Sequence, residues 1–383
     1  MPAEFDEHDQ LEDAEGADFW EAMKQRMPLE VQERVDAFVR EARRPLGPGD
    51  PRRHHFLPQF FQKRFATEQG QLLVVPIDRS APRLTHVTNI AVMSDLYTSI
   101  DKEIGETVAV EKVLALADGQ ASGAIARLAY GVLFPPSARD REDLAIWLAL
   151  LHVRDPYTRR RTEAMADHVF KSVSSLAANP LVARSRLRES LGREPTEAEV
   201  AELVDATDHL DQLEATPHQN ELVKLMLTTA LELVPYLLTR RIVVLRFPEP
   251  GLVLSDRPLV LQQDPENRDP FRGVGIGTAD EILLPLDRST AMILHSRPSI
   301  RDHVMNAPPD CTVDDFNQAV VANAAAEVYC HPDDSGRLER VRFRDADRPL
   351  MHVDGASWVK AKTDGINAPP VRKRHRRYRH DGP

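Results

Sequence analysis

The chain has few cysteines, and its apolar runs are short. Cys311 and Cys330 are the two cysteines among 383 residues, and they form no C-x-x-C pair, so we expect reduced thiols rather than a disulfide or zinc framework. The longest apolar run, residues 144–151, is far below the ~20 residues that span a bilayer. The first 21 residues hold nine acids and no Lys or Arg, which argues against a secretory signal. We therefore expect a soluble, cytoplasmic protein without membrane association.

Lysine is also scarce, and charge is distributed unevenly along the chain. Arginine outnumbers lysine 40 to 9, a bias that indicates a GC-rich bacterial genome. The net charge is −11, yet a dense basic cluster stands near the end of the chain. It consists of Arg372, Lys373, Arg374, Arg376, Arg377 and Arg379. Such a tail is suited to the phosphates of a nucleic acid or to another anionic partner. The alternative is a solubilising terminus, or one that folds back on the acidic N-terminal arm.

The composition divides the chain into three parts. Residues 1–45 form an acidic arm, disordered at first, in which Phe19 to Arg44 has apolar residues near helical spacing. A linker rich in Pro and Gly follows, and the main domain covers residues 52–345. Residues 346–383 form a C-terminal extension that ends in the basic tail.

The spacing of hydrophobic residues changes along the main domain from one typical of helices to one typical of strands. A hairpin is predicted over residues 72–77 and 83–88, and helices over residues 106–130, 138–154, 197–213 and 220–238. Strands are predicted over residues 242–247, 252–254, 282–286 and 292–295, then a helix over 313–329 and an edge strand over 340–343. We therefore predict an α+β fold, with a mainly helical first two-thirds packed on a small, mostly antiparallel sheet from the last third.

Several short motifs follow one another in a fixed order. The first is His55-Phe56-Leu57-Pro58-Gln59-Phe60, and the later ones are Asn89-Ile90-Ala91, Asp95-Leu96-Tyr97, Arg154-Asp155-Pro156, Leu254-Ser255-Asp256-Arg257-Pro258 and Leu284-Pro285-Leu286. In these pieces the sequence resembles the bacterial family called domain of unknown function 4238 (DUF4238), over about residues 52–330. The resemblance implies no particular activity, and it does not include the arm or the tail.

Three residues of these motifs are candidates for catalysis. His55 has the side chain of a general base or metal ligand, although a histidine before a helix is also a common capping or packing residue. Arg154, after a leucine-rich helix, would hold a carboxylate or phosphate, or else tie the helix end to Asp155 or another acid. Asp256 would bind a metal or orient His55, or else serve with Ser255 as a turn residue that binds backbone amides.

Neighbouring positions have weaker functional interpretations. The Arg159-Arg160-Arg161 run is predicted to be a solvated face, with contact to anions as the alternative. The glycine-rich segment 273–277 lacks the preceding strand and following helix of a dinucleotide site, so it is predicted to be a loop or hairpin. Common metalloprotease, P-loop and hydrolase signatures are absent from the sequence.

Two hypotheses of function follow. One is a hydrolase or nuclease-like enzyme acting on a phosphate-bearing substrate through His55, Arg154 and Asp256. The other is a noncatalytic module that binds a nucleic acid or a protein. The metal requirement, any cofactor and the oligomeric state are left open by the sequence.

Overall fold

The computed structural model describes residues 46–47, 52–101, 105–107, 109–131, 134–264 and 273–343. The predicted acidic arm and the basic tail from Arg372 to Arg379 lie outside these residues. The chain divides into two compact units. One comprises residues 1–51 and 97–113, and the other comprises residues 52–96 and 114–383.

A small hairpin is the described part of the first unit. Strands β5 (Ser99–Asp101) and β6 (Gly105–Thr107) pair in an antiparallel manner. The amide of Leu46 donates to the carbonyl of Glu106 at 2.7 Å, so the incoming chain is tied to this hairpin. Helix α4 (Ala109–Tyr130) begins in this unit and continues into the second.

The second unit opens with short strands and one aromatic turn of helix. Strand β1 (Arg53–His55) pairs with β4 (Val92–Ser94), and α3 (Gln59–Gln62) and the 3-10 turn η1 (Val87–Asn89) lie between them in the sequence. Phe61 of α3 packs edge-on against Trp147, with ring centroids 5.2 Å apart. The predicted hairpin is confirmed as β2 (Gln71–Pro76) and β3 (Arg83–His86).

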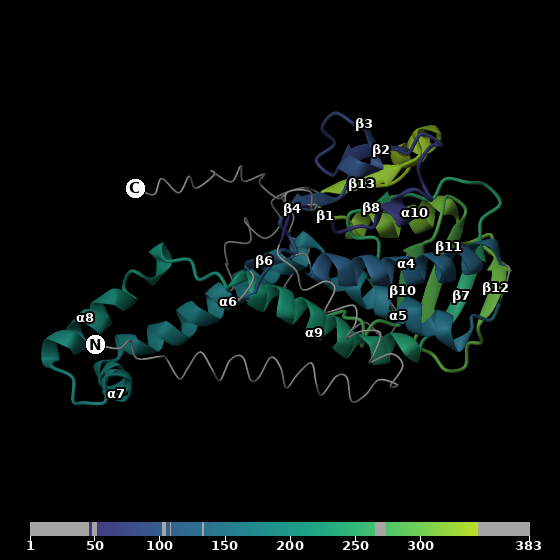
Figure 1. The fold of residues 1–383 in the computed structure, drawn as a ribbon. Helices are drawn as coiled ribbons and strands as arrows, with labels where there is room; N and C mark the ends of the chain where they lie inside the picture. The colour runs from purple at the N-terminus through teal and green to yellow at the C-terminus, as the bar shows by residue number, and fades with distance from the viewer. Residues whose placement is uncertain are drawn as a thin grey trace. The chain divides into compact units, whose positions relative to one another are not determined.

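The central helices begin at side-chain caps that the sequence supplies. Ser137 and Asp140 form a capping box at the start of α5 (Ala138–Val153), and Asp155 caps α6 (Pro156–Ser175). After the 3-10 turn η2 (Leu176–Ala178) come α7 (Pro180–Leu191), α8 (Glu197–Thr207), the 3-10 turn η3 (Leu210–Gln212) and α9 (Gln219–Leu238). Helices α7 and α8 pack on each other and on η2, at the end of α6 (Figure 1).

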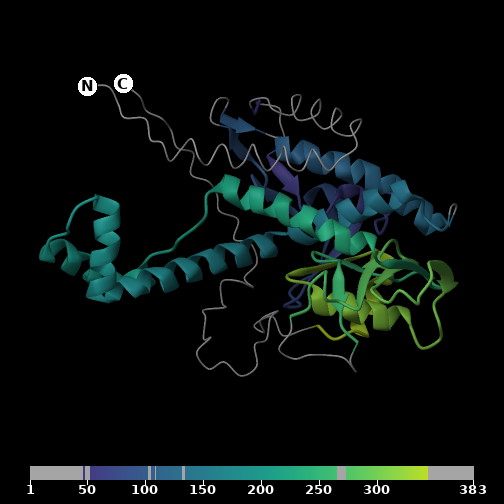
Figure 2. The ribbon, with the colours of Figure 1, turned by 90° about the horizontal axis from the view of Figure 1, so that it is seen from below.

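A five-stranded sheet follows, in the order β12-β7-β11-β10-β9. Its strands are β7 (Arg241–Arg246), β9 (Val260–Gln262), β10 (Glu281–Pro285), β11 (Thr290–His295) and β12 (His303–Asn306). All pairings are antiparallel except that between β12 and β7. Helices α5 and α9 pack together and cover one face of this sheet (Figure 2).

A second, four-stranded sheet joins distant parts of the chain, in the order β3-β2-β13-β8. Strand β13 (Glu327–Cys330) lies between β2 and β8 (Leu254–Ser255) and is antiparallel to both. Helix α10 (Val313–Asn323) precedes β13, and the 3-10 helix η5 (Pro332–Glu339) follows it. Residues from both ends of the main domain therefore share one sheet.

The α+β class is confirmed, but the predicted arrangement is only partly right. Strands β1 to β6 lie within the first third, which was expected to be mainly helical. The helix predicted over residues 313–329 is confirmed as α10 but ends earlier, at Asn323, because Val328 and Tyr329 are buried in β13 between two strands. The edge strand predicted over residues 340–343 is wrong, because η5 ends at Glu339 and a bend and irregular chain follow it. No described helix has the length and apolarity needed to cross a membrane.

Candidate functional site at the junction of α5 and α6

Arg154 is a buried ion-pair partner at the end of α5. Its side chain is 1% exposed, and its two terminal nitrogens lie 3.3 and 3.1 Å from the two carboxylate oxygens of Asp118. Trp147 Nε1 donates to the same carboxylate at 3.0 Å. Of the two roles considered from the sequence, the tie to an acid is the one seen, and the acid is Asp118 of α4 rather than Asp155.

Asp256 holds the backbone of a turn. Its carboxylate accepts hydrogen bonds from the amides of Ala325, Ala326 and Glu327 at 2.8, 2.7 and 3.2 Å. Burial raises the pKa of Asp256 to about 6, while the amides of Ala325 and Ala326 oppose that rise by stabilising the charged form. Both oxygens are therefore used to fix the loop after β8 to the start of β13.

His55 is half-buried at the end of β1. Its Nδ1 lies 3.4 Å from the side-chain nitrogen of Gln59, and its buried Nε2 makes no hydrogen bond within the described part of the chain. Burial lowers the pKa of His55, the backbone of Val87 and Thr88 opposes this shift, and the charges of Arg53 and Arg154 add to it. No hydrogen bond or ion pair between described residues joins His55 to Asp256. The structure thus brings His55 near Arg154, and it gives Asp256 a separate set of contacts.

The Arg154-Asp155-Pro156 and Ser255-Asp256-Arg257-Pro258 motifs meet in space. Arg257 Nε lies 3.6 Å from Asp155 Oδ2, with 14% of the arginine side chain and 6% of the aspartate side chain exposed. Asp155 is also the cap of α6 and accepts from the amides of Tyr157 and Thr158 at 2.7 and 3.0 Å and from the Thr158 hydroxyl at 2.8 Å. Most of the accepting capacity of Asp155 therefore serves the helix, and its charge is shared with Arg257.

The main chain of Arg257 is held on both sides. Its amide donates to the Ser255 hydroxyl at 3.3 Å, and its carbonyl accepts from Asn323 Nδ2 at 2.6 Å. The same nitrogen of Asn323 donates to the carbonyl of Leu259 at 3.1 Å. By contrast, the two terminal nitrogens of the Arg257 guanidinium donate no hydrogen bond to any residue the structure describes. A fixed backbone thus presents a guanidinium fork whose outer donors remain open.

His152 is in the last turn of α5, within range of an electrostatic effect of the Arg257 charge. Burial lowers the pKa of His152 to about 4, and the positive charges of Arg257 and Arg161 contribute to the shift. Asp155 opposes it. Neither ring nitrogen of His152 makes a hydrogen bond to a described residue. A neutral imidazole is therefore within electrostatic range of an open guanidinium at the junction of α5 and α6.

The arginine run at the start of α6 is more than a solvated face. Arg159 donates to the carbonyl of Leu96 at 3.0 Å and to the side chain of Gln219 at 2.6 Å. The guanidinium of Arg160 lies 4.5 Å from the centre of the Tyr157 ring. Burial and the charge of Arg257 lower the pKa of Arg161, so these two cations repel each other across the junction. Of this run, Arg161 is the member that adds positive charge to the site.

His152 and Arg257 were not among the residues predicted from the sequence. Arg257 stands inside a quoted motif, but Asp256 drew attention because aspartate has more obvious chemistry. His152 immediately precedes the Val153-Arg154-Asp155-Pro156 segment, where one helix ends and the next begins. The sequence could have indicated His152 by this position, because polar side chains come together where one helix ends and the next begins.

Residues of other motifs and the second cysteine have structural roles. Asp95 pairs with Arg52 at 3.1 Å, and Cys330 is a buried thiol whose pKa burial raises to about 12. The segment 273–277 is followed by a turn and β10, with no helix, as predicted. Among the described residues, no group of three or more His, Cys, Asp or Glu side chains could hold a metal ion.

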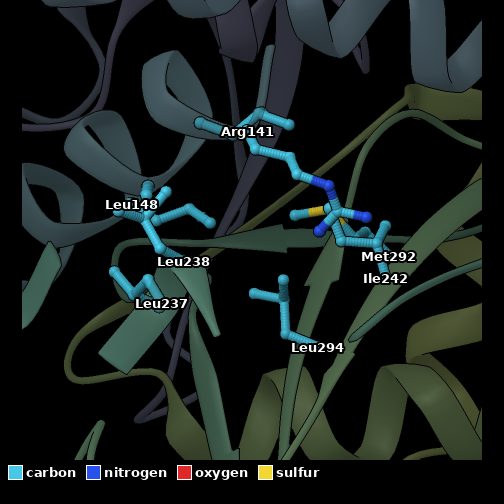
Figure 3. A pocket seen from close by; sticks show the side chains of 9 residues that line it. Arg141, Leu148, Leu237, Leu238, Ile242, Met292 and Leu294 are labelled. Atoms are coloured by element: carbon cyan, nitrogen blue, oxygen red, sulfur yellow. The ribbon is translucent and has the colours of Figure 1, made fainter. Parts of the chain in front are cut away.

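A small cavity lies elsewhere, between α5, α9 and the five-stranded sheet (Figure 3). Its volume is about 10 Å³, room for about one water molecule. Apolar side chains line most of it, and Figure 3 shows Arg141 extending toward Ile242 and Met292. Arg141 forms an ion pair with Asp302, which also accepts from the Ile242 amide at 2.8 Å. This cavity is too small and too apolar for a charged ligand.

Fold and site together define an α+β protein with an arginine- and histidine-containing junction between two helices. The family described as "Protein of unknown function (DUF4238)" matches residues 53–334, and the chain belongs to this family. The match spans both motifs that meet at the junction. No curated protein and no solved structure matched the chain.

Proposed function

We propose that the protein binds a phosphate-bearing ligand at the junction of α5 and α6, through Arg257, His152 and Arg161. The observation that carries the proposal is the open guanidinium fork of Arg257. Its backbone is anchored by Ser255 and Asn323, while its outer donors have no partner among the described residues. A planar guanidinium with two parallel donors matches the oxygens of a phosphate.

The local charge supports an anion as the occupant. The charge of Arg257 lowers the pKa of Arg161, and Asp155, which opposes that shift, also pairs with Arg257. The α6 cap also engages that carboxylate through three hydrogen bonds, so Asp155 divides its contacts between the helix and Arg257. An anion bound between these cations would relieve their repulsion, and this gain strengthens its binding.

The test is calorimetric titration of the full chain with inorganic phosphate, pyrophosphate, AMP and a short single-stranded DNA. Arg257→Gln should weaken binding of the phosphate probes by at least ~10-fold, because it removes a charge-assisted contact of ~1.5–3 kcal/mol. The matched control is Arg64→Gln. Arg64 also has a 14% exposed side chain in an ion pair, with Asp287, away from the junction. Equal affinity in the two variants would refute the proposed site.

An enzyme that hydrolyses the bound phosphate ester is a second candidate, favoured by His55. Burial lowers the pKa of the imidazole, its Nε2 is without a hydrogen bond among described residues, and the charge of Arg154 is near it. In this proposal His55 is the general base, Arg257 holds the phosphate, and Asp256 positions the loop of Arg257. Phosphate release that falls at least ~100-fold in His55→Gln, with phosphate affinity retained, would support it. Equal release in wild type and variant would exclude it.

A further inference from the structure

Helices α6, α7 and α8 bury few of their residues. The buried residues are Pro156 and Tyr157 in α6, Ala183 in α7 and Val200 in α8. In Figures 1 and 2, the far half of α6 lies apart from both sheets, with α7 and α8 at its end. Because a helix gains most of its stability from the packing of an apolar face, this part of the chain has surface to offer to a partner.

One face of α6 is apolar and exposed. Met165, Val169, Val173 and the C-cap residue Leu176 are 62%, 50%, 47% and 58% exposed. Residues three or four apart lie on one side of a helix, so these four side chains form a single apolar row. At 1.5 Å per residue the row is about 16 Å long. Contiguous apolar surface that a helix turns to the solvent is a common mark of an interaction site.

The charged residues of α6 lie away from the apolar row. Glu163, Asp167 and Lys171 are four residues apart and form a second row, on the opposite side of the helix. Their charges are matched within the chain, because Arg159 pairs with Glu163 at 2.9 Å and Lys171 pairs with Asp167 at 2.7 Å. Asp167 also accepts from the amide of Ala215 at 2.9 Å, so the loop before α9 lies on the charged side. The apolar row is left exposed, and it contains no Lys, Arg, Asp or Glu.

We propose that the apolar row is a dimer interface, on which the same row of a second copy of this chain packs in the antiparallel direction. The charge distribution favours this occupant. An identical partner brings the same surface to both sides of the contact, and here that surface carries no charge that would repel its copy. A nucleic acid would instead need cations on this face. Antiparallel helices also place their dipoles in a favourable arrangement. The inference is independent of the phosphate site proposed above.

The positions of the four side chains define a register for the two copies. With a two-fold axis near residues 170–171, Met165 of one chain faces Leu176 of the partner subunit. In the same register Val169 faces Val173 of the partner subunit, and the symmetry repeats each contact. The interface is small for a permanent dimer, so we expect a dissociation constant on the order of 10 µM.

The experiment is analytical ultracentrifugation of the full chain at ~1 to ~500 µM, where the measured mass should rise from one chain toward two. Val169→Glu places a carboxylate in the middle of the row on both copies and should weaken self-association at least ~100-fold. The matched control is Leu116→Glu. Leu116 is 41% exposed on α4, outside the row, and its substitution should change the dissociation constant by less than ~3-fold. Wild-type melting temperatures of both variants show that the fold is intact.

Mixed variants test the antiparallel register. Val173→Lys should also weaken self-association, yet a mixture of Val169→Glu with Val173→Lys should associate at least ~10-fold more tightly than either variant alone. The reason is that the register places the two new, opposite charges against each other. A mixture of Val169→Glu with Val169→Lys should gain less, because these positions face each other in a parallel pair.

Several outcomes would overturn the proposal. One is a wild-type chain that is monomeric at every concentration. If removal of residues 1–45 then allowed association, those residues would be the occupant of the row in place of a second copy. Equal association of Val169→Glu and Leu116→Glu would place the interface elsewhere, and a larger gain in the Val169→Glu and Val169→Lys mixture would show that the copies are parallel.

Discussion

Arg288 and Arg257 each lie against a buried carboxylate, and they differ in how many of their donors that carboxylate uses. Arg288 forms a two-point pair with Asp334, from Nε at 2.7 Å and from Nη2 at 2.8 Å. Arg257 approaches Asp155 through Nε alone, at 3.6 Å, and Asp155 is occupied by a helix cap. The first geometry holds the fold together, because donors and acceptors satisfy each other. The second leaves the two terminal nitrogens of Arg257 without a hydrogen-bond partner among the described residues.

The largest effect is expected where the Arg257 loop is anchored. Asp256→Asn replaces a carboxylate oxygen that accepts from backbone amides by an amide nitrogen that can only donate. The buried side-chain NH2 group of the variant would face backbone N–H groups and find no acceptor there. This should lower the free energy of unfolding by about 2–4 kcal/mol. Urea denaturation measures the change. The control is Asp205→Asn on the exposed face of α8, which should change stability by less than ~0.5 kcal/mol. Equal stability of the two variants would contradict the anchoring role.

Two substitutions test directly whether the ion pairs of Arg288 and Arg257 differ in their contribution to stability. Arg288→Gln leaves Asp334, which is 7% exposed, without its two-point partner, and should cost about 2–3 kcal/mol of stability. Arg257→Gln should cost about 1 kcal/mol, because the Asp155 carboxylate keeps its bonds to the start of α6. Denaturation curves for both variants provide the measurement. A loss for Arg257→Gln as large as that for Arg288→Gln would show that both pairs are structural.

The pH dependence of stability tests the electrostatic surroundings of His152, which include Arg257. Its pKa in the folded protein is about 4, below the ordinary value of 6.5, so the unfolded chain binds more protons between these values. The contribution of His152 to the free energy of unfolding is therefore fully present above about pH 6.5, and it is lost as the pH falls toward 4. Because the side chain is partly exposed, we expect a loss of about 1–2 kcal/mol. Denaturation curves of His152→Gln at the same pH values should show no such loss of stability. If the free energy of unfolding of the variant depends on pH as that of the wild type does, His152 is not the group responsible.

The smallest effect on stability is expected for removal of the residues after Gly365. Because the basic tail is predicted to act through charge alone, its loss should leave the melting temperature unchanged within about 1 °C. Binding to single-stranded DNA at low salt should weaken, since up to six phosphate contacts and their counterion release are lost. DNA titrations at several salt concentrations test this. Unchanged affinity at low salt would reject the nucleic-acid role of the tail.

Local signals made the helices predictable, while long-range pairings remained hidden. The apolar spacing over residues 138–154 predicted the helix that the structure has as α5, which begins behind the capping box of Ser137 and Asp140. The segment 327–330 could not be recognised as a strand from its own residues, because it is stabilised by β2, which lies far away in the sequence. Contacts between distant residues also could not be predicted for the candidate site. His55, Arg154 and Asp256 were chosen by residue type, but only the fold shows that Arg154 and Asp256 are bound by internal partners.

The pairing of Leu73 with Cys330 in the four-stranded sheet also has a consequence for the newborn chain. At ~5–20 residues per second, the roughly 250 residues between these strands take on the order of 10–50 s to synthesise. During that time β2 has β3 on one side and an open edge on the other. Asn323 and the amides that bind Asp256 emerge in the same late segment. The residues that support the Arg257 loop and the last strand of this sheet are therefore synthesised together, and the proposed ligand site is complete only when this sheet forms.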